Sequence, residues 1–140
     1  MTQPSTETRS LVIEREMPHP PEKIWRALVE TDLIKQWLMD NDFAPAAGHK
    51  FQFRATPMPN WNGLIDCEVL AMEPHRQLSY SWASMGLESV VNWTLTPTKT
   101  GTMVRMEQSG FRPDQDFAYK GASYGWNNFI GRLEQVLGSL

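Results

Sequence analysis

The sequence predicts an α+β fold in which an antiparallel sheet is covered by a long C-terminal helix. Between about residues 50 and 107, apolar side chains alternate with polar ones in five successive runs. Alternation with a period of two is typical of strands that have one buried face. A sixth run of this kind lies near the N-terminus. The last twenty-odd residues instead repeat their apolar side chains at steps of three and four, which is the period of an α-helix.

The N-terminal part is predicted to contain one strand and two short helices. Residues 1–8 are polar and are expected to form a disordered tail. The first strand covers about residues 9–17 and ends at a cluster of prolines. Pro21 is a favourable first residue for a helix. Thr31 and Asp32 can cap a second short helix, which directly follows the first one.

The five later runs give the sheet its buried face. Their inward-facing residues are Phe51 and Phe53; Ile65, Cys67 and Val69; Leu78, Tyr80 and Trp82; Val91, Trp93 and Leu95; and Val104 and Met106. Segments that contain proline or glycine separate the runs, as in a meander of hairpins. Together with the N-terminal strand, the runs predict a six-stranded antiparallel sheet with one face in the core and one in water.

The closing helix changes character along its length. Its C-terminal half carries aliphatic residues that suit a core, namely Ile130, Leu133, Val136 and Leu137. Its N-terminal half carries Tyr119, Ala122, Ser123 and Trp126, and glycines interrupt it. Each glycine weakens a helix by up to about 1 kcal/mol relative to alanine, so we expect something other than the core to approach the backbone there. This half of the helix is predicted to form one wall of a cavity.

Length and composition limit the classes of function. The chain of 140 residues suffices for one domain, over residues 9–140, with one sizeable core. A net charge of −3 argues against a nucleic-acid partner. The single cysteine, Cys67, cannot form an internal disulfide, and no segment has the roughly 18 apolar residues of a membrane span. We therefore expect a soluble cytoplasmic protein. No metal, phosphate or dinucleotide motif is present, so no cofactor is predicted.

Several segments together resemble one known family. Pro-Glu-Lys-Ile-Trp-Arg-Ala-Leu at 21–28, followed by Lys-Gln-Trp at 35–37, is similar to the opening of the heat-shock-protein-90 ATPase activator homologue-like proteins. Residues 78–82, 108–111 and 125–126 resemble two later strands and the closing helix of the same family. This family belongs to the START-like (SRPBCC) helix-grip superfamily. The resemblance implies a curved sheet wrapped around the long helix, with a cavity between them.

Aromatic and methionine side chains are abundant and gather on the predicted inner faces. The chain has 6 Trp, 6 Phe, 3 Tyr and 8 Met. Core packing explains any one of them, but the set also suits a mostly apolar small-molecule pocket with few polar groups. The predicted ligand-binding residues are Phe53, Trp61, Tyr80, Trp82, Trp93, Met106, Tyr119, Ser123 and Trp126. Met58, Trp61 and Met85 lie in loops from which they can gate the mouth.

Three classes of function follow from these observations. Non-catalytic binding of a small apolar, aromatic or lipid-like molecule is favoured. The resemblance implies a second class, stimulation of a heat-shock-protein ATPase during the stress response, with that ATPase as partner. The third is a cyclase or isomerase that uses the same cavity, because the superfamily contains such enzymes as well as binders. The inward residues offer mainly Tyr80, Tyr119 and Ser123, none of which is a strong acid or base near pH 7.

Residues 121–125, with Ser123 at their centre, fit the Gly-x-Ser-x-Gly pattern of a hydrolase nucleophile. That motif lies on a turn between a strand and a helix, and its histidine follows later in the chain. Here Ser123 falls within a predicted helix, and all three histidines precede it. No catalytic residue is therefore predicted, and Ser123 is interpreted as a small residue in the cavity wall.

Overall fold

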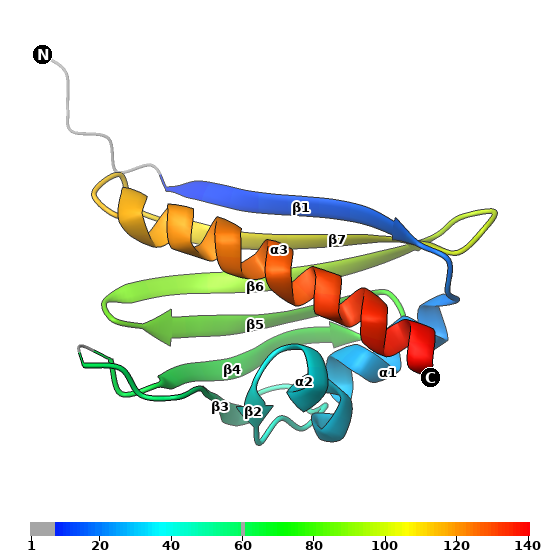
Figure 1. Ribbon diagram of the computed structural model, residues 1–140, viewed down its shortest axis with the longest axis horizontal. Helices are drawn as coiled ribbons and strands as arrows, with labels where there is room; N and C mark the ends of the chain where they lie inside the picture. Colours follow the sequence, from blue (N-terminus) through cyan, green and yellow to red (C-terminus); the bar gives the residue numbers. More distant parts are fainter. Residues whose placement is uncertain (1–7, 60) are drawn as a thin grey trace, which may run out of the picture.

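The computed structural model describes residues 8–59 and 61–140, so residues 1–7 of the tail predicted at 1–8, and residue 60, lie outside the described residues. The helices and strands follow one another along the chain in the order β1 (Arg9–Met17), α1 (Pro21–Val29), α2 (Thr31–Trp37), β2 (Asp40–Asn41), β3 (Lys50–Arg54), β4 (Leu64–Glu73), β5 (Gln77–Ser84), β6 (Leu87–Pro97), β7 (Thr102–Phe111) and α3 (Asp116–Ser139). The strands form an open sheet, and α3 crosses one of its faces (Figure 1). The predicted α+β class and the covering helix are confirmed.

The sheet has one strand more than the sequence predicts. Its strand order is β1-β7-β6-β5-β4-β3-β2, and neighbouring strands are antiparallel. The prediction of six strands is wrong because β2 contributes a seventh, in which Asn41 pairs with Phe53 of β3. β2 has only two residues. A segment of that length cannot show the alternation by which the other strands are recognised.

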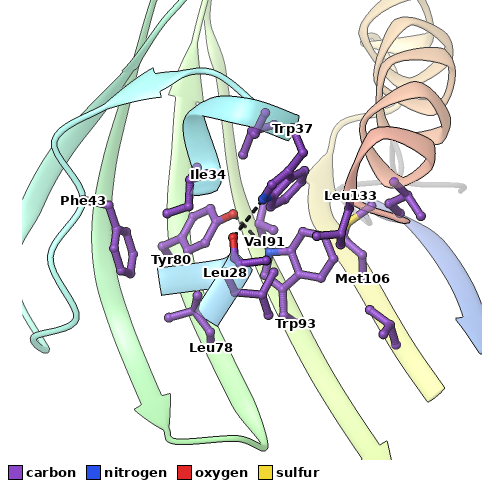
Figure 2. Close-up of a cluster of buried hydrophobic side chains, with 14 of the residues drawn as sticks. Leu28, Ile34, Trp37, Phe43, Leu78, Tyr80, Val91, Trp93, Met106 and Leu133 are labelled. Atoms are coloured by element: carbon purple, nitrogen blue, oxygen red, sulfur yellow. Dashed lines mark hydrogen bonds between the residues drawn. The ribbon is translucent and has the colours of Figure 1, made fainter. Parts of the chain in front are cut away.

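The predicted inward face of the sheet is buried throughout. On β5, Leu78, Tyr80 and Trp82 are buried, while the serines between them are half-buried. Across the sheet, Leu78 pairs with Trp93, and Trp93 pairs with Met106. Figure 2 shows Leu78, Tyr80, Trp93 and Met106 grouped on the same side of the strands. Together they form the centre of the core.

The two short helices cover one end of this face. α1 begins at Pro21, as predicted. The prediction that Thr31 caps α2 is wrong, because Thr31 is the first helical residue and the cap position belongs to Glu30. The carbonyl of Glu30 accepts hydrogen bonds from the backbone N–H groups of Leu33 and Ile34 at 3.0 and 2.9 Å. One residue is thus enough to turn the chain from α1 into α2.

Helix α3 is packed differently in its two halves. The C-terminal half lies near α1 and α2 (Figure 1) and buries Ile130, Leu133, Val136 and Leu137. In the first half, protein atoms leave the backbone open at two glycines that line a cavity. A β-carbon added at Gly121 would meet nothing within 4 Å, and one added at Gly125 would meet only Phe129, at 3.9 Å. Free space, rather than another segment, adjoins these glycines.

The turn before β7 depends on a glycine, and this dependence can be tested. A β-carbon at Gly101 would lie 2.0 Å from the carbonyl oxygen of Met17 and 2.9 Å from the backbone nitrogen of His19. Gly101→Ala is therefore expected to force the end of β1 away and to lower the free energy of unfolding by about 1–3 kcal/mol. Gly131→Ala is the matched control, because a β-carbon there has open space. It should stabilise α3 by up to about 1 kcal/mol. Urea denaturation compares the two, and equal midpoints would contradict the expectation.

Candidate functional site

A cavity of about 720 Å³ lies between the first half of α3 and the sheet. This volume falls within the range of about 300–1,000 Å³ that is usual for small-molecule sites. The helix contributes small and aromatic side chains to the wall, namely Ala118, Gly121, Ala122, Gly125, Trp126 and Phe129. The sheet contributes Ile65, Trp82, Ser84, Leu87 and Gln108. The glycines and alanines of α3 leave the volume that larger residues would fill.

Exposed apolar side chains from two loops and from the start of α3 surround the entrance. Met58, Met85 and Phe117 line the cavity and are 64, 70 and 93% exposed. Trp61, from the same loop as Met58, also lines it and donates a hydrogen bond from Nε1 to Ser84 Oγ at 3.0 Å. Large exposed apolar side chains that gather around a cavity are typical of sites that bind apolar molecules.

Two tryptophans form the floor of the cavity. The rings of Trp82 and Trp126 have centroids 5.2 Å apart, and Phe129 packs edge-on to Trp126 at 5.7 Å. Both tryptophans are buried, with Trp126 only 2% exposed. Because their neighbours on the core side are aromatic as well, the rings are held in fixed orientations. The two rings therefore form a rigid and mostly buried part of the cavity wall.

A chain of buried hydrogen bonds joins the two tryptophans. Trp126 Nε1 donates to Gln108 Oε1 at 2.7 Å, and Gln108 Nε2 donates to Ser89 Oγ at 2.9 Å. Ser89 Oγ in turn donates to the carbonyl oxygen of Trp82 at 2.9 Å. Buried polar groups that satisfy each other in this way rigidify their surroundings. This chain of hydrogen bonds fixes the rotamer of Trp126, whose ring lies in an otherwise apolar wall.

The interior of the cavity carries no formal charge. Of the lining residues that the structure describes, only Asp114 is ionisable. Asp114 is exposed and pairs with Arg112 Nε at 3.2 Å, so its charge lies at the entrance and is compensated there. The deep part of the cavity offers apolar atoms and the amide of Gln108.

The predicted site residues divide between the cavity and the core. Trp61, Trp82 and Trp126 line the cavity. Phe53 lies behind Trp82, with ring centroids 5.3 Å apart, and is itself fully buried. It supports the cavity floor without bordering the free space.

Three other predicted residues, Tyr80, Trp93 and Met106, lie in the core away from the cavity lining. Trp93 Nε1 donates to the Tyr80 hydroxyl at 3.1 Å (Figure 2). Burial raises the pKa of the Tyr80 phenol, which therefore stays protonated near pH 7. Met106 pairs with Trp93 across β6 and β7.

The last two predicted residues lie on α3 outside the described lining. Tyr119 packs edge-on against Phe111, with centroids 5.3 Å apart, and the guanidinium of Arg9 lies 3.8 Å from the centre of its ring. The guanidinium of Arg9 also donates a hydrogen bond to the Asp116 carboxylate, and this salt bridge lowers the pKa of that carboxyl. Tyr119 thus ties α3 to β1. Ser123 is half-buried in the middle of α3, not on a turn between a strand and a helix.

Sequence reasoning did not select Gln108 as a site residue, although a signal was present. Gln108 follows Val104 and Met106 at the same alternation on β7, so it faces inward. A polar residue at an inward position must have a buried partner or border a cavity. Gln108 does both. Phe117, Ala118 and Ala122 line the cavity as well, but their types alone do not distinguish a cavity wall from a packed helix.

Two further kinds of feature are missing from residues 8–59 and 61–140. No three His, Cys, Asp or Glu side chains come together in an arrangement that could hold a metal ion there. None of the described helices combines the length and the apolar character that crossing a membrane requires.

Comparisons with known proteins relate the chain to one family. The family described as "Activator of Hsp90 ATPase homolog 1-like protein" matches residues 18–138. The crystal structure of protein MLL2253 from Mesorhizobium loti is 55% identical, with a TM-score of 0.88, over 94% of this chain and 98% of that one. No curated protein matches the chain.

Two more distant structures share the fold. The Aha1 dimer from Colwellia psychrerythraea is 24% identical, with a TM-score of 0.79, over 92% of this chain and 96% of that one. DynU16, a protein in the dynemicin biosynthetic locus, is also 24% identical, with a TM-score of 0.78. That match covers 96% of this chain and 48% of DynU16, so this chain spans about half of the longer protein. These likenesses show the helix-grip architecture alone.

Proposed function

The chain belongs to the family of Activator of Hsp90 ATPase homolog 1-like proteins, and we propose that this member binds a small apolar, ring-containing molecule in the cavity under α3 without transforming it. One observation carries the proposal, namely the uncharged cavity of about 720 Å³ whose floor is formed by Trp82 and Trp126. Aromatic floors of this kind bind flat apolar rings by stacking and by burying surface.

The absence of suitable catalytic groups from the lining supports binding over catalysis. General acid–base catalysis needs a side chain that exchanges protons near neutral pH within reach of the substrate. Among the described lining residues, Asp114 lies exposed at the entrance and the buried polar groups are amide, hydroxyl and indole. Tyr80, one of the few inward groups that a cyclase or isomerase could use, is part of the core.

Filling the cavity tests the proposal. Ala122 lies in its wall and is half-buried, so Ala122→Phe should occupy the space where the ligand sits. Native mass spectrometry of the protein purified from cells is expected to show a retained small molecule on the wild type and none on Ala122→Phe. Asn128→Phe is the matched control, because it places the same ring on an exposed position of α3. It should retain the molecule. A molecule retained equally by all three proteins would contradict binding in this cavity.

Ser123 is expected to have no role in hydrolysis. It lies mid-helix, and none of the histidines lines the cavity. Ser123→Ala should therefore leave the hydrolysis of activated esters at the level of the wild type, which should itself equal the uncatalysed background. Stoichiometric labelling of Ser123 by a serine-reactive phosphonate would contradict this expectation.

Stimulation of a chaperone ATPase remains the alternative that the family description suggests. The site described above does not favour it, since that activity needs a docking surface for a protein rather than a cavity. A cytoplasmic location likewise stays a prediction from the sequence. Measuring the ATPase rate of a heat-shock protein with and without the purified chain distinguishes the two functions, and a stimulated rate that Ala122→Phe leaves unchanged would favour the alternative.

A further inference from the structure

The amide of Gln108 has a defined orientation. Trp126 Nε1–H can only donate, so the atom that faces it at 2.7 Å must be the amide oxygen of Gln108. The amide nitrogen therefore faces Ser89, whose hydroxyl hydrogen is engaged with the carbonyl of Trp82 and whose oxygen accepts. The surrounding groups thus fix which end of the amide is the donor.

This arrangement leaves donor capacity at the cavity. The amide nitrogen carries two hydrogens, and the described residues supply it with one acceptor, Ser89 Oγ. Gln108 lines the cavity but is only 1% exposed. Gln108 therefore borders the free space over a small area, which suits contact with a single atom. A lone carbonyl oxygen meets that requirement, whereas a carboxylate or a phosphate brings further oxygens that would find no partner.

Charge points to the same class of ligand. The described lining contains no lysine, arginine or histidine, and its one carboxylate lies at the entrance. Moving an ion from water into such a site is costly because no opposite charge compensates it. The buried end of a ligand must then be neutral.

We propose that the cavity selects neutral ring compounds with a carbonyl group, whose oxygen accepts the second hydrogen of Gln108 Nε2. The proposal rests on the proposed binding function and defines its ligand class. Gln108 is then a specificity-determining residue, and Ser89 and Trp126 position its amide.

Three probes of nearly equal shape test the proposal, namely acetylnaphthalene, isopropylnaphthalene and naphthoate, all substituted at the same ring carbon. Their dissociation constants are measured by tryptophan fluorescence with the wild type and with Gln108→Met, which keeps the unbranched chain but removes the amide. We compare the ratio of the dissociation constant of isopropylnaphthalene to that of acetylnaphthalene. This ratio should be about three- to tenfold smaller in Gln108→Met than in the wild type, as expected for the loss of one hydrogen bond. Naphthoate should bind the wild type at least about tenfold more weakly than acetylnaphthalene.

Two further measurements keep the test decisive even if Gln108→Met folds poorly. Asn128→Phe changes only an exposed position of α3 and leaves the Gln108 amide in place, so it should retain the preference for the ketone. The infrared carbonyl band of acetylnaphthalene bound to the wild type should lie at a lower frequency than in cyclohexane, because the oxygen accepts a hydrogen bond. An unshifted band, or a ratio that is the same in the wild type and Gln108→Met, would overturn the proposal while the binding function stands. If none of the three probes binds the wild type, the proposal and the binding function both fail.

Discussion

Leu133→Ala is expected to lower the free energy of unfolding by about 2–5 kcal/mol, the range for removing a large side chain from a core. Leu133 is 0% exposed on the half of α3 that lies near α1 and α2. Figure 2 shows it in the same cluster as Trp37, Trp93 and Met106. The substitution leaves a cavity there that these rigid neighbours cannot close. Urea denaturation followed by circular dichroism measures the change.

The neighbouring Arg132 supplies the control for this prediction. Arg132 is exposed on the same helix, so Arg132→Ala should change the free energy of unfolding by no more than about 0.5 kcal/mol. If Leu133→Ala also left the unfolding midpoint unchanged, α3 would not be part of the core, and the division of the helix into a core half and a cavity half would be wrong.

Trp126→Ala is expected to weaken the binding of a ring-containing ligand at least about tenfold. Its ring forms part of the cavity floor, and an aromatic contact contributes about 0.5–1.5 kcal/mol beyond the area that it buries. The buried area adds to this, and about 1.4 kcal/mol corresponds to one decade in the dissociation constant. Isothermal titration calorimetry with acetylnaphthalene measures the loss without depending on tryptophan fluorescence.

Trp126 also contributes to the fold, so its two roles have to be separated. Removing the indole leaves Gln108 Oε1 without its donor. Trp126→Phe loses that hydrogen bond too but keeps an aromatic ring, so it should bind more tightly than Trp126→Ala. If Trp126 is only a core residue, both variants lower the stability of the fold, and no apolar probe binds the wild type.

Most of the fold could be predicted because its pattern is repeated and strong. Strands β3 to β7 alternate clearly, since one face of the sheet is buried under α3 and the other lies in water. Strand β2 escaped prediction because pairing with β3, and not its own two residues, makes it a strand. The start of α2 was misplaced by one residue because the backbone carbonyl of Glu30 begins the helix without a side-chain cap.

The site was harder to predict than the fold. An inward aromatic residue on a strand has the same sequence pattern whether it packs against a helix or borders free space. Trp93 lies near Trp37 of α2, with ring centroids 5.7 Å apart. Trp82 instead lines the cavity, and it lies two residues closer to the β5–β6 turn than Tyr80 does. Whether an inward residue lies in the core or at the cavity depends on how far α1 and α2 extend over the sheet. The sequences of the strands alone do not reveal that extent. Tyr119 was misplaced for a similar reason, because its ring packs against Phe111 and Arg9 on the β1 side of α3.

Titration of the wild type with acetylnaphthalene, followed by tryptophan fluorescence, tests the central claim most directly. Three of the six tryptophans, Trp61, Trp82 and Trp126, line the cavity. The account predicts quenching that saturates at one probe per chain in the wild type and in Asn128→Phe, and that disappears in Ala122→Phe while the unfolding midpoint of that variant stays unchanged. Quenching that never saturates, or that Ala122→Phe leaves intact, would contradict the claim that the cavity under α3 is a binding site.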